Sequence, residues 1–349
     1  MKFGIMFSFG RPPGFEMTEQ ETYRELKELV PLIEELGYHS FHVTEHHFQF
    51  NGWCPSPLVA LATAAGLSDE LRLATNCLLV PLYNPVRLAE DVATLDNLSN
   101  GRVTLAVAPG YVSEEFGGYG IAYEKRMRVF EEALDLLVAA WTKETFSFDG
   151  EFFHVPESAL VPRPVQQPHP PLWYGVSGPR NLARAARRRC TLVASPRHTI
   201  RELQEHFAAY ERAAAELGFT PSERPVIREV FLADTTEQAE ELAGPALQDM
   251  FDLYVKKSAS GERALTTDDG KPITDAAQGA FELFKSRFIV GDPEVAAREI
   301  EKIDEALRPT ELICRMQQPL ILTKHLRRSI ELFAKEVMPA FARDRVATG

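Results

Sequence analysis

The chain is poor in cysteine. Its four cysteines, Cys54, Cys77, Cys190 and Cys314, stand far apart, and no Cys-x-x-Cys pair occurs. This spacing suggests neither a zinc knuckle nor a disulfide framework, so we expect reduced thiols. Positive charge is also scarce, because 38 lysines and arginines stand against 50 aspartates and glutamates, which gives a net charge of −12. Such a surface repels phosphate backbones and makes nucleic acid a poor partner.

Long apolar runs are absent as well. No stretch approaches the roughly 20 residues that span a bilayer, and the apolar start of the chain is too short for a secretory signal. We therefore expect a cytoplasmic protein that does not enter a membrane. The remaining composition is ordinary, with 349 residues of which 45% are apolar and 25% are charged. That length fits one large α/β barrel or two average domains.

Short β-rich runs alternate with amphipathic stretches along the chain. Eight strands, each followed by a helix, predict an α/β fold of the (β/α)8 TIM barrel type, with 1–349 as a single domain. A doubly wound sheet would need a glycine fingerprint after its first strand, and Gly10-Arg11-Pro12-Pro13-Gly14 is not one. The strands are expected at 2–9, 39–44, 71–80, 103–108, 172–176, 190–194, 226–233 and 311–316. The helices are expected at 19–36, 57–67, 85–98, 127–141, 179–189, 199–217, 237–251 and 324–338.

Two segments interrupt this alternation. Residues 146–155 alternate around Asp149-Gly150, which indicates a β-hairpin. An insertion of about 252–309 separates the seventh helix from the eighth strand. Its polar first part, 256–272, is expected to form a lid over the active face, with a disordered decoration as the alternative. A helix at 275–285, a β-rich run at 286–290 and a helix opened by Asp292-Pro293 are expected to follow.

Glu45-His46-His47-Phe48 follows the second predicted strand, so it places imidazoles at the active face. Adjacent strand side chains point to opposite faces, and at most one of His46 and His47 can face a pocket unless the backbone has turned. An imidazole there can move protons near neutral pH. The alternative is a polar lid over the barrel end or a helix cap.

Three further strand ends share that face, and Ala108-Pro109-Gly110-Tyr111 ends the fourth strand. At Asn76-Cys77, small and polar side chains interrupt an aliphatic strand, and a flat ring could approach the backbone. The fifth strand ends in Ser177-Gly178-Pro179-Arg180, where free N–H groups and the helix dipole favour a phosphate. The Ser177 hydroxyl and the Arg180 guanidinium would be additional donors. An ordinary capped helix start explains the same pattern without a ligand.

These motifs together resemble the bacterial luciferase-like flavin-dependent monooxygenase family over nearly the whole chain. The matching residues are Glu45-His46-His47-Phe48, Asn84-Pro85-Val86-Arg87-Leu88-Ala89-Glu90-Asp91, Leu95-Asp96-Asn97-Leu98-Ser99-Asn100-Gly101-Arg102, Gly110-Tyr111 and Gly291-Asp292-Pro293-Glu294.

The resemblance implies roles for several residues. His46 would be catalytic, and the cofactor would bind beside Glu45, His47 and Tyr111. A cis peptide bond is implied at Asn76-Cys77, beneath the flavin. The family's phosphate grip maps to Ser177 and Gly178, with Arg180 as our candidate for an additional donor.

The resemblance also implies the chemistry. Reduced FMN would react with O2 to give a flavin 4a-hydroperoxide, which oxygenates a small organic substrate in a dry pocket. We expect Phe7, Phe9, Phe48 and Trp53 to form its apolar wall. A separate flavin reductase would supply reduced FMN. The helices at 57–67 and 85–98 carry apolar residues beyond one face, and family members commonly dimerise there, so a homodimer is expected.

The chain departs from luciferase at two positions. Ala108 and Pro109 stand where luciferase has its reactive cysteine and a phosphate-binding arginine, so the chain lacks both of these residues. Light emission and a long-chain aldehyde substrate therefore do not follow. Three alternatives remain open. The first is a hydride-transfer oxidoreductase that uses deazaflavin or FMN. The second is a metal-dependent barrel hydrolase with ligands from Glu45, His46 or His47, although three ligands are usually needed and no second cluster is visible. The third is a non-catalytic flavin-binding subunit.

Overall fold

Nine strands form one sheet in the computed structural model of the chain, which describes residues 1–49, 52–259, 265–273 and 280–342. Their order is β10-β9-β11-β1-β2-β3-β4-β7-β8, and every neighbouring pair is parallel. The strands are β1 (Lys2–Phe7), β2 (Ser40–Val43), β3 (Arg72–Leu79), β4 (Val103–Ala108), β7 (Leu172–Gly175), β8 (Thr191–Val193), β9 (Pro225–Leu232), β10 (Phe288–Gly291) and β11 (Glu311–Gln317).

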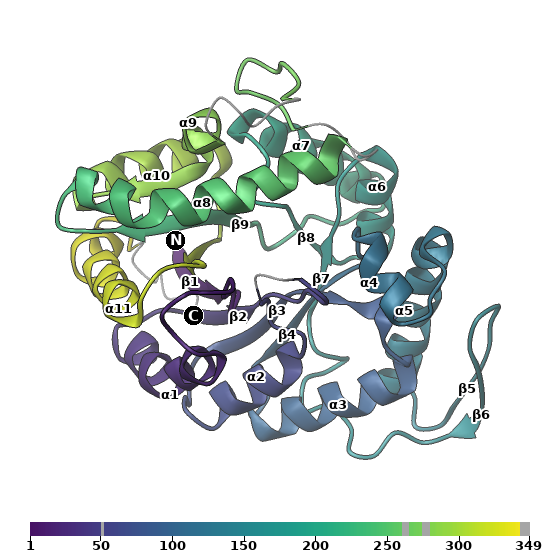
Figure 1. Cartoon of the computed structure of the whole chain (residues 1–349). Helices are drawn as coiled ribbons and strands as arrows, with labels where there is room; N and C mark the ends of the chain where they lie inside the picture. Colours follow the sequence, from purple (N-terminus) through teal and green to yellow (C-terminus); the bar gives the residue numbers. More distant parts are fainter. Residues whose placement is uncertain (50–51, 260–264, 274–279, 343–349) are drawn as a thin grey trace, which may run out of the picture.

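The sheet curls into a barrel. β8 and β9 come within a Cα separation of 8 Å, although no strand ladder joins them. β9 pairs with β11 through its first half and with β10 through its second half, so β10 is an addition to the eight barrel strands. Figure 1 shows the strands at the centre with helices around them. This is the (β/α)8 architecture that the sequence predicts, with a ninth strand added by the insertion.

Eight helices follow the eight barrel strands, and their starts agree with the sequence prediction to within about one residue. Asn84 begins one of them, because its side chain accepts hydrogen bonds from the backbone N–H groups of Val86 and Arg87 at 3.0 and 3.2 Å. None of the described helices is long and apolar enough to cross a membrane. The helices are α1 (Glu19–Glu35), α2 (Pro57–Ala65), α3 (Pro85–Leu98), α5 (Arg126–Thr142), α6 (Pro179–Arg187), α7 (Ile200–Glu216), α8 (Thr236–Ala259) and α11 (Thr323–Leu332).

The predicted hairpin is present as β5 (Phe146–Asp149) and β6 (His154–Ser158), which pair antiparallel. A short helix that the sequence pattern did not predict, α4 (Ser113–Gly118), follows β4. It contains two glycines and is too short to show a helical period, so pattern reasoning misses it. Its position matters because its Glu115 contacts His46, a residue of the cavity wall described below.

The insertion differs from its predicted outline. Helix α8 continues to Ala259, beyond the expected end at residue 251, because Tyr254 and Val255 are buried against the core. The lid expected at 256–272 and the helix expected at 275–285 fall partly on 260–264 and 274–279, which lie outside the described residues. The described part contains α9 (Ala280–Phe284), β10 and α10 (Pro293–Leu307), and the Asp292 side chain accepts from the backbone N–H of Val295 as predicted.

A buried ionic network lies inside the barrel. Ser40 donates its hydroxyl proton to Glu311, and the Glu311 carboxylate lies 3.6 Å from Nε2 of His42. Burial acts to raise the pKa of Glu311, but the contacts with His42 and Ser40 outweigh it and lower the pKa below its ordinary value. Gly4 is required beside this network, because a Cβ there would lie 2.7 Å from a Glu311 carboxylate oxygen and would overlap Ser40.

Glu311→Gln should lower the free energy of unfolding by about 3–5 kcal/mol at neutral pH, because it breaks a buried pair and leaves its partner unmatched. A lowered folded pKa means that this stabilisation is fully present above about pH 4.3, the ordinary value for glutamate in an unfolded chain. It is lost as the pH falls through the folded pKa. Denaturant titrations at pH 7 and pH 3 measure the difference, with Glu305→Gln on the exposed face of α10 as control. An equal loss for both variants, or no loss, would contradict the assignment.

Candidate active site

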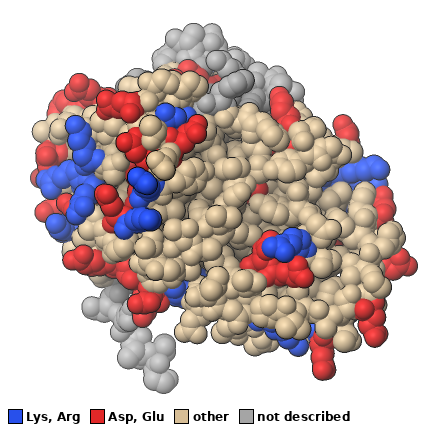
Figure 2. Space-filling view, turned by 60° about the horizontal axis from the view of Figure 1, so that its bottom comes forward, with Lys and Arg blue, Asp and Glu red and all other residues tan. Residues whose placement is uncertain are grey.

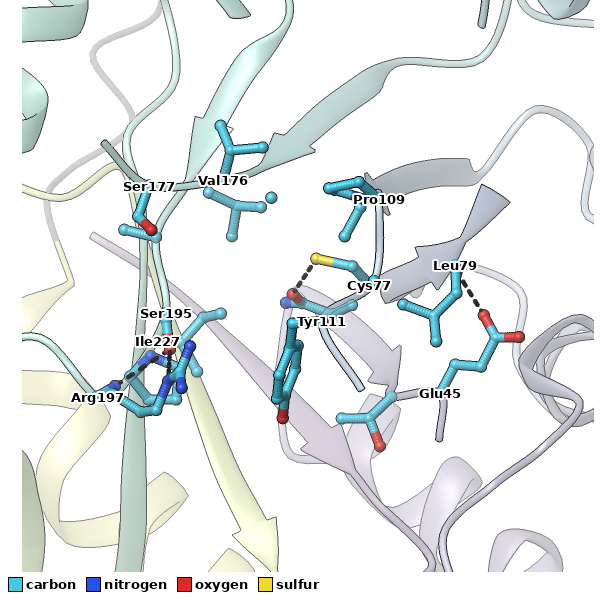
Figure 3. Close-up of a pocket in the computed structure, with 18 of the residues that line it drawn as sticks. Glu45, Cys77, Leu79, Pro109, Tyr111, Val176, Ser177, Ser195, Arg197 and Ile227 are labelled. Atoms are coloured by element: carbon cyan, nitrogen blue, oxygen red, sulfur yellow. Dashed lines mark hydrogen bonds between the residues drawn. The ribbon is translucent and has the colours of Figure 1, made fainter. Parts of the chain in front are cut away.

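A cavity of about 410 Å³ opens at the carboxyl ends of the barrel strands. Parallel strands bring these ends to one face, so residues far apart in the sequence meet in its wall. Figure 3 shows Glu45 and Leu79 on one side of the cavity, Arg197 and Ile227 on the other, and Tyr111 between them. The charged and aromatic residues of the wall are Glu45, His46, Trp53, Tyr111, Arg126, Arg197, His198, Glu202, Tyr254 and Arg315.

His46 is held in the wall by a carboxylate and two aromatic rings. Its Nδ1 lies 2.8 Å from Oε1 of Glu115, a side chain that is 1% exposed. Trp53 and Tyr111 contact the imidazole edge-on, with ring centroids 5.1 and 5.7 Å away. Because a carboxylate accepts, Nδ1 carries the proton. Nε2 has no partner in the described part of the chain and is free to take or give a proton.

Glu115 is a site residue that sequence reasoning missed. The chain reverses after β4 at Gly110, which has a φ of 77° and whose Cβ would lie 2.8 Å from the Phe116 ring. This turn starts the path into α4 and brings Glu115 under His46. The same carboxylate oxygen accepts the backbone N–H of His47 at 3.0 Å, so it fixes both the ring and the loop. The signal available in the sequence was the pair Glu114-Glu115 between the apolar residues Val112 and Phe116.

Glu45 and His47 form a second network beside the first. Nε2 of His47 lies 2.9 Å from Glu45, whose carboxylate also accepts from the Leu79 N–H and the Tyr83 hydroxyl, both at 2.7 Å. Burial, and then the Glu45 charge, raise the pKa of Tyr83, so its hydroxyl stays protonated and donates. Nδ1 of His47 lies 3.0 Å from the Tyr119 hydroxyl. Glu45 lines the cavity, whereas His47 does not, and both side chains hold the loop that presents His46.

Asn76 and Cys77 lie in the wall next to this network, and the peptide bond between them is cis, as the resemblance implies. Burial raises the pKa of Cys77 to about 12, with a smaller contribution from Glu45, so the thiol is protonated at neutral pH. A Cβ at Gly175 would collide with the Cys77 sulfur. Glycine at the end of β7 therefore leaves room for this wall.

Ser177 and Asn181 line the cavity where β7 ends and α6 begins, and Arg126 at the start of α5 lines it too. Arg126 donates from Nη1 to the backbone carbonyl of Tyr123 at 3.1 Å. Its guanidinium also lies over the Tyr123 ring, 3.8 Å from the ring centroid. Its Nε is buried and has no partner among the described residues. An unpartnered guanidinium N–H beside a helix start suits an anion.

Of the residues predicted for the phosphate, Ser177 lines the cavity, whereas Gly178 and Arg180 do not. Arg180 is exposed and does not line the cavity, and Gly178, with a φ of 85°, caps α6 without lining the cavity. The predicted apolar wall needs a larger correction. Of Phe7, Phe9, Phe48 and Trp53, only Trp53 lines the cavity. Phe7 and Phe9 are buried in the core, and Phe48 is 63% exposed with its ring against Gly118.

Within the described residues, no group of three or more His, Cys, Asp or Glu side chains is arranged to hold a metal ion. His46 and His47 each direct a ring nitrogen at a different carboxylate, Glu115 and Glu45. The metal-dependent hydrolase alternative therefore finds no ligand set in that part of the chain.

The family model for luciferase-like monooxygenases matches residues 1–308, and the chain belongs to this family. The oxygenase component of a flavin-dependent trigonelline monooxygenase from Acinetobacter baylyi is 26% identical, over 99% of this chain and 97% of its own. The family predicted from the sequence is confirmed.

Solved structures share the fold. Monooxygenase RslO1 from Streptomyces bottropensis has a TM-score of 0.84 at 24% identity, covering 98% of this chain and 100% of its own. The oxygenating constituent of 3,6-diketocamphane monooxygenase from Pseudomonas putida, solved with FMN, has a TM-score of 0.82 at 22% identity. The match covers 97% of this chain and 98% of its own. An F420-dependent secondary alcohol dehydrogenase has a TM-score of 0.75 at 19% identity, and the match covers 98% of this chain and 99% of its own. The predicted fold is confirmed.

Proposed function

We propose that this chain is an FMN-dependent monooxygenase that uses reduced FMN and O2 to oxygenate a small organic substrate in the 410 Å³ cavity. The observation that carries the proposal is that one cavity wall holds both His46, which Glu115 fixes from behind, and Arg126, whose Nε is buried and has no partner among the described residues. The first supplies a positioned proton donor and acceptor, and the second suits a phosphate. The flavin-dependent and FMN-bound relatives support the same cofactor.

The residues present fit FMN. Arg126, Ser177 and Asn181 would hold its phosphate, and Asn76-Cys77 would lie against its flat ring. When bound, reduced FMN supplies the electrons that activate dioxygen. His46, fixed through Nδ1, would deliver or remove a proton with Nε2. Trp53, Tyr254 and Leu265 add apolar surface that helps to keep water out of the cavity.

A separate reductase is the proposed source of reduced FMN. The trigonelline monooxygenase from Acinetobacter baylyi is named as an oxygenase component, which implies a partner that supplies its reduced flavin. We propose the same division of labour for this chain, and we propose that it acts in the cytoplasm.

Equilibrium titration with FMN, riboflavin and the deazaflavin coenzyme F420 tests the cofactor. FMN should bind saturably, riboflavin more weakly because it lacks the phosphate, and F420 not at all. Reduced FMN with O2 should then give an oxygenated product. Saturable F420 binding without FMN binding would favour the hydride-transfer alternative instead.

We also propose a homodimer through α2 and α3. Val59 on α2 and Leu98 at the end of α3 are 69% and 66% exposed. The side of the molecule on which α2 and α3 lie, brought forward in Figure 2, shows a wide area without charged side chains that one cluster of red and blue side chains interrupts. Exposed apolar side chains such as Val59 and Leu98 suit a two-fold interface.

Light scattering at micromolar concentration should give twice the chain mass of 39.2 kDa. Val59→Glu should shift this mass toward the monomer, because a charge would be placed inside the proposed interface. Glu216→Gln, on α7, serves as a control that should leave the dimer intact. A wild-type mass of 39.2 kDa would contradict the proposal.

A further inference from the structure

Arg197 is a further cation in the cavity wall, and the proposed binding of FMN does not use it. It follows β8, whereas Arg126 is the first residue of α5 and Ser177 lies between β7 and α6. Figure 3 shows Arg197 beside Ser195 and Ile227, apart from Ser177. Two different parts of the wall therefore present guanidinium or hydroxyl donors.

The surroundings of Arg197 hold it in one place. Its Nε donates to the Ser195 hydroxyl oxygen at 3.1 Å, and its backbone N–H donates to the same oxygen at 3.3 Å. The guanidinium lies 5.3 Å from the Tyr111 ring centroid and 5.1 Å from that of Tyr254. A guanidinium held between two ring faces keeps a fixed orientation, so it loses little conformational entropy when a ligand binds.

No carboxylate neutralises Arg197 within the described residues. Arg315, which also lines the cavity, differs because Glu229 pairs with it through both carboxylate oxygens. Glu202, an acid of the same wall, accepts from the Thr199 N–H and the Thr266 hydroxyl, both at 3.0 Å.

These partners, together with His198, outweigh burial and lower the pKa of Glu202. The Glu202 carboxylate is therefore ionised, and its oxygens already accept hydrogen bonds from Thr199 and Thr266. Arg197, by contrast, lines the cavity without a carboxylate partner in the described part of the chain.

We propose that Arg197 binds the carboxylate of the substrate, which makes the substrate an organic acid with an apolar or aromatic body. The planar fork of the guanidinium matches a carboxylate with two parallel hydrogen bonds. Tyr111 and Tyr254 flank that position, Ile227 lies beside it, and Val193 is a further apolar residue of the same cavity wall. The inference rests on the proposed function, because it names the substrate class of that oxygenase.

The test compares acids with their neutral amides on the FMN-loaded protein. Benzoate and nicotinate are titrated against benzamide and nicotinamide, and the visible absorption of bound FMN is followed. Wild type should bind the acids roughly tenfold to a hundredfold more tightly than the amides. Arg197→Gln should abolish that preference, and Arg197→Lys should keep part of it. Arg212→Gln removes an exposed arginine on α7 and should keep the whole preference.

FMN affinity, measured separately, should stay within about twofold in Arg197→Gln. Loss of FMN binding together with unchanged riboflavin binding would place the cofactor phosphate on Arg197 and overturn the inference. A wild type that prefers no acid, or an Arg197→Gln protein that still does, would overturn it too. Failure of wild type to bind FMN would instead overturn the proposed function, and this inference with it. Unchanged thermal unfolding of Arg197→Gln shows that the variant is folded.

Discussion

His46→Ala is expected to lower oxygenation by roughly 10²–10⁴, the usual effect of losing a general acid or base. FMN affinity should stay within a few-fold, because the proposed phosphate contacts come from Arg126 and Ser177 instead. Product formation from an accepted substrate with reduced FMN and O2 measures the rate, and an FMN titration measures the affinity. Turnover at the wild-type rate would remove His46 from the chemistry.

His47→Ala is the matched comparison, because the neighbouring imidazole lies outside the cavity wall. It contacts Glu45 and Tyr119, so its loss should disturb the loop and lower stability more than it lowers the chemical step. A larger loss of turnover in His47→Ala than in His46→Ala, at equal stability, would reverse the two roles.

Arg126→Met is expected to weaken FMN binding by roughly tenfold to a hundredfold, the range for a lost charge-assisted contact. Riboflavin binding should not change, because riboflavin has no phosphate for the guanidinium to meet. Fluorescence titration with both flavins measures the two affinities.

Arg128→Met is the control for Arg126→Met. Arg128 lies two residues further along α5, its side chain is 64% exposed, and it pairs with Glu151 outside the cavity. An equal effect of both substitutions would attribute the change to overall charge. Equal weakening of FMN and riboflavin by Arg126→Met would place Arg126 away from the phosphate.

Local signals in the sequence predicted local structure well. Asn84 and Asp292 mark helix starts because an N-cap side chain bonds to backbone two or three residues away. The predicted end of α8 was wrong, because the burial of Tyr254 and Val255 is a tertiary contact that outweighs the polar composition around them.

The site was less predictable because its contacts are long-range. Glu115 bonds to a histidine 69 residues away, and no local pattern indicates that pairing. A helix start shows where backbone N–H groups point but leaves side-chain direction open. Arg180 therefore faces solvent, while Arg126, at the start of a different helix, lines the cavity. Expecting Phe48 in the pocket was wrong because the backbone turns at that residue, with a φ of 55°.

A crystal structure of the FMN complex tests the central claim most directly. The account predicts the phosphate on Ser177 and Arg126, the flat ring against Asn76-Cys77, and Nε2 of His46 facing that ring. It also predicts that Arg197 makes no contact with the phosphate. FMN bound outside this cavity, or a phosphate held by Arg197 with His46 remote from the ring, would contradict the account.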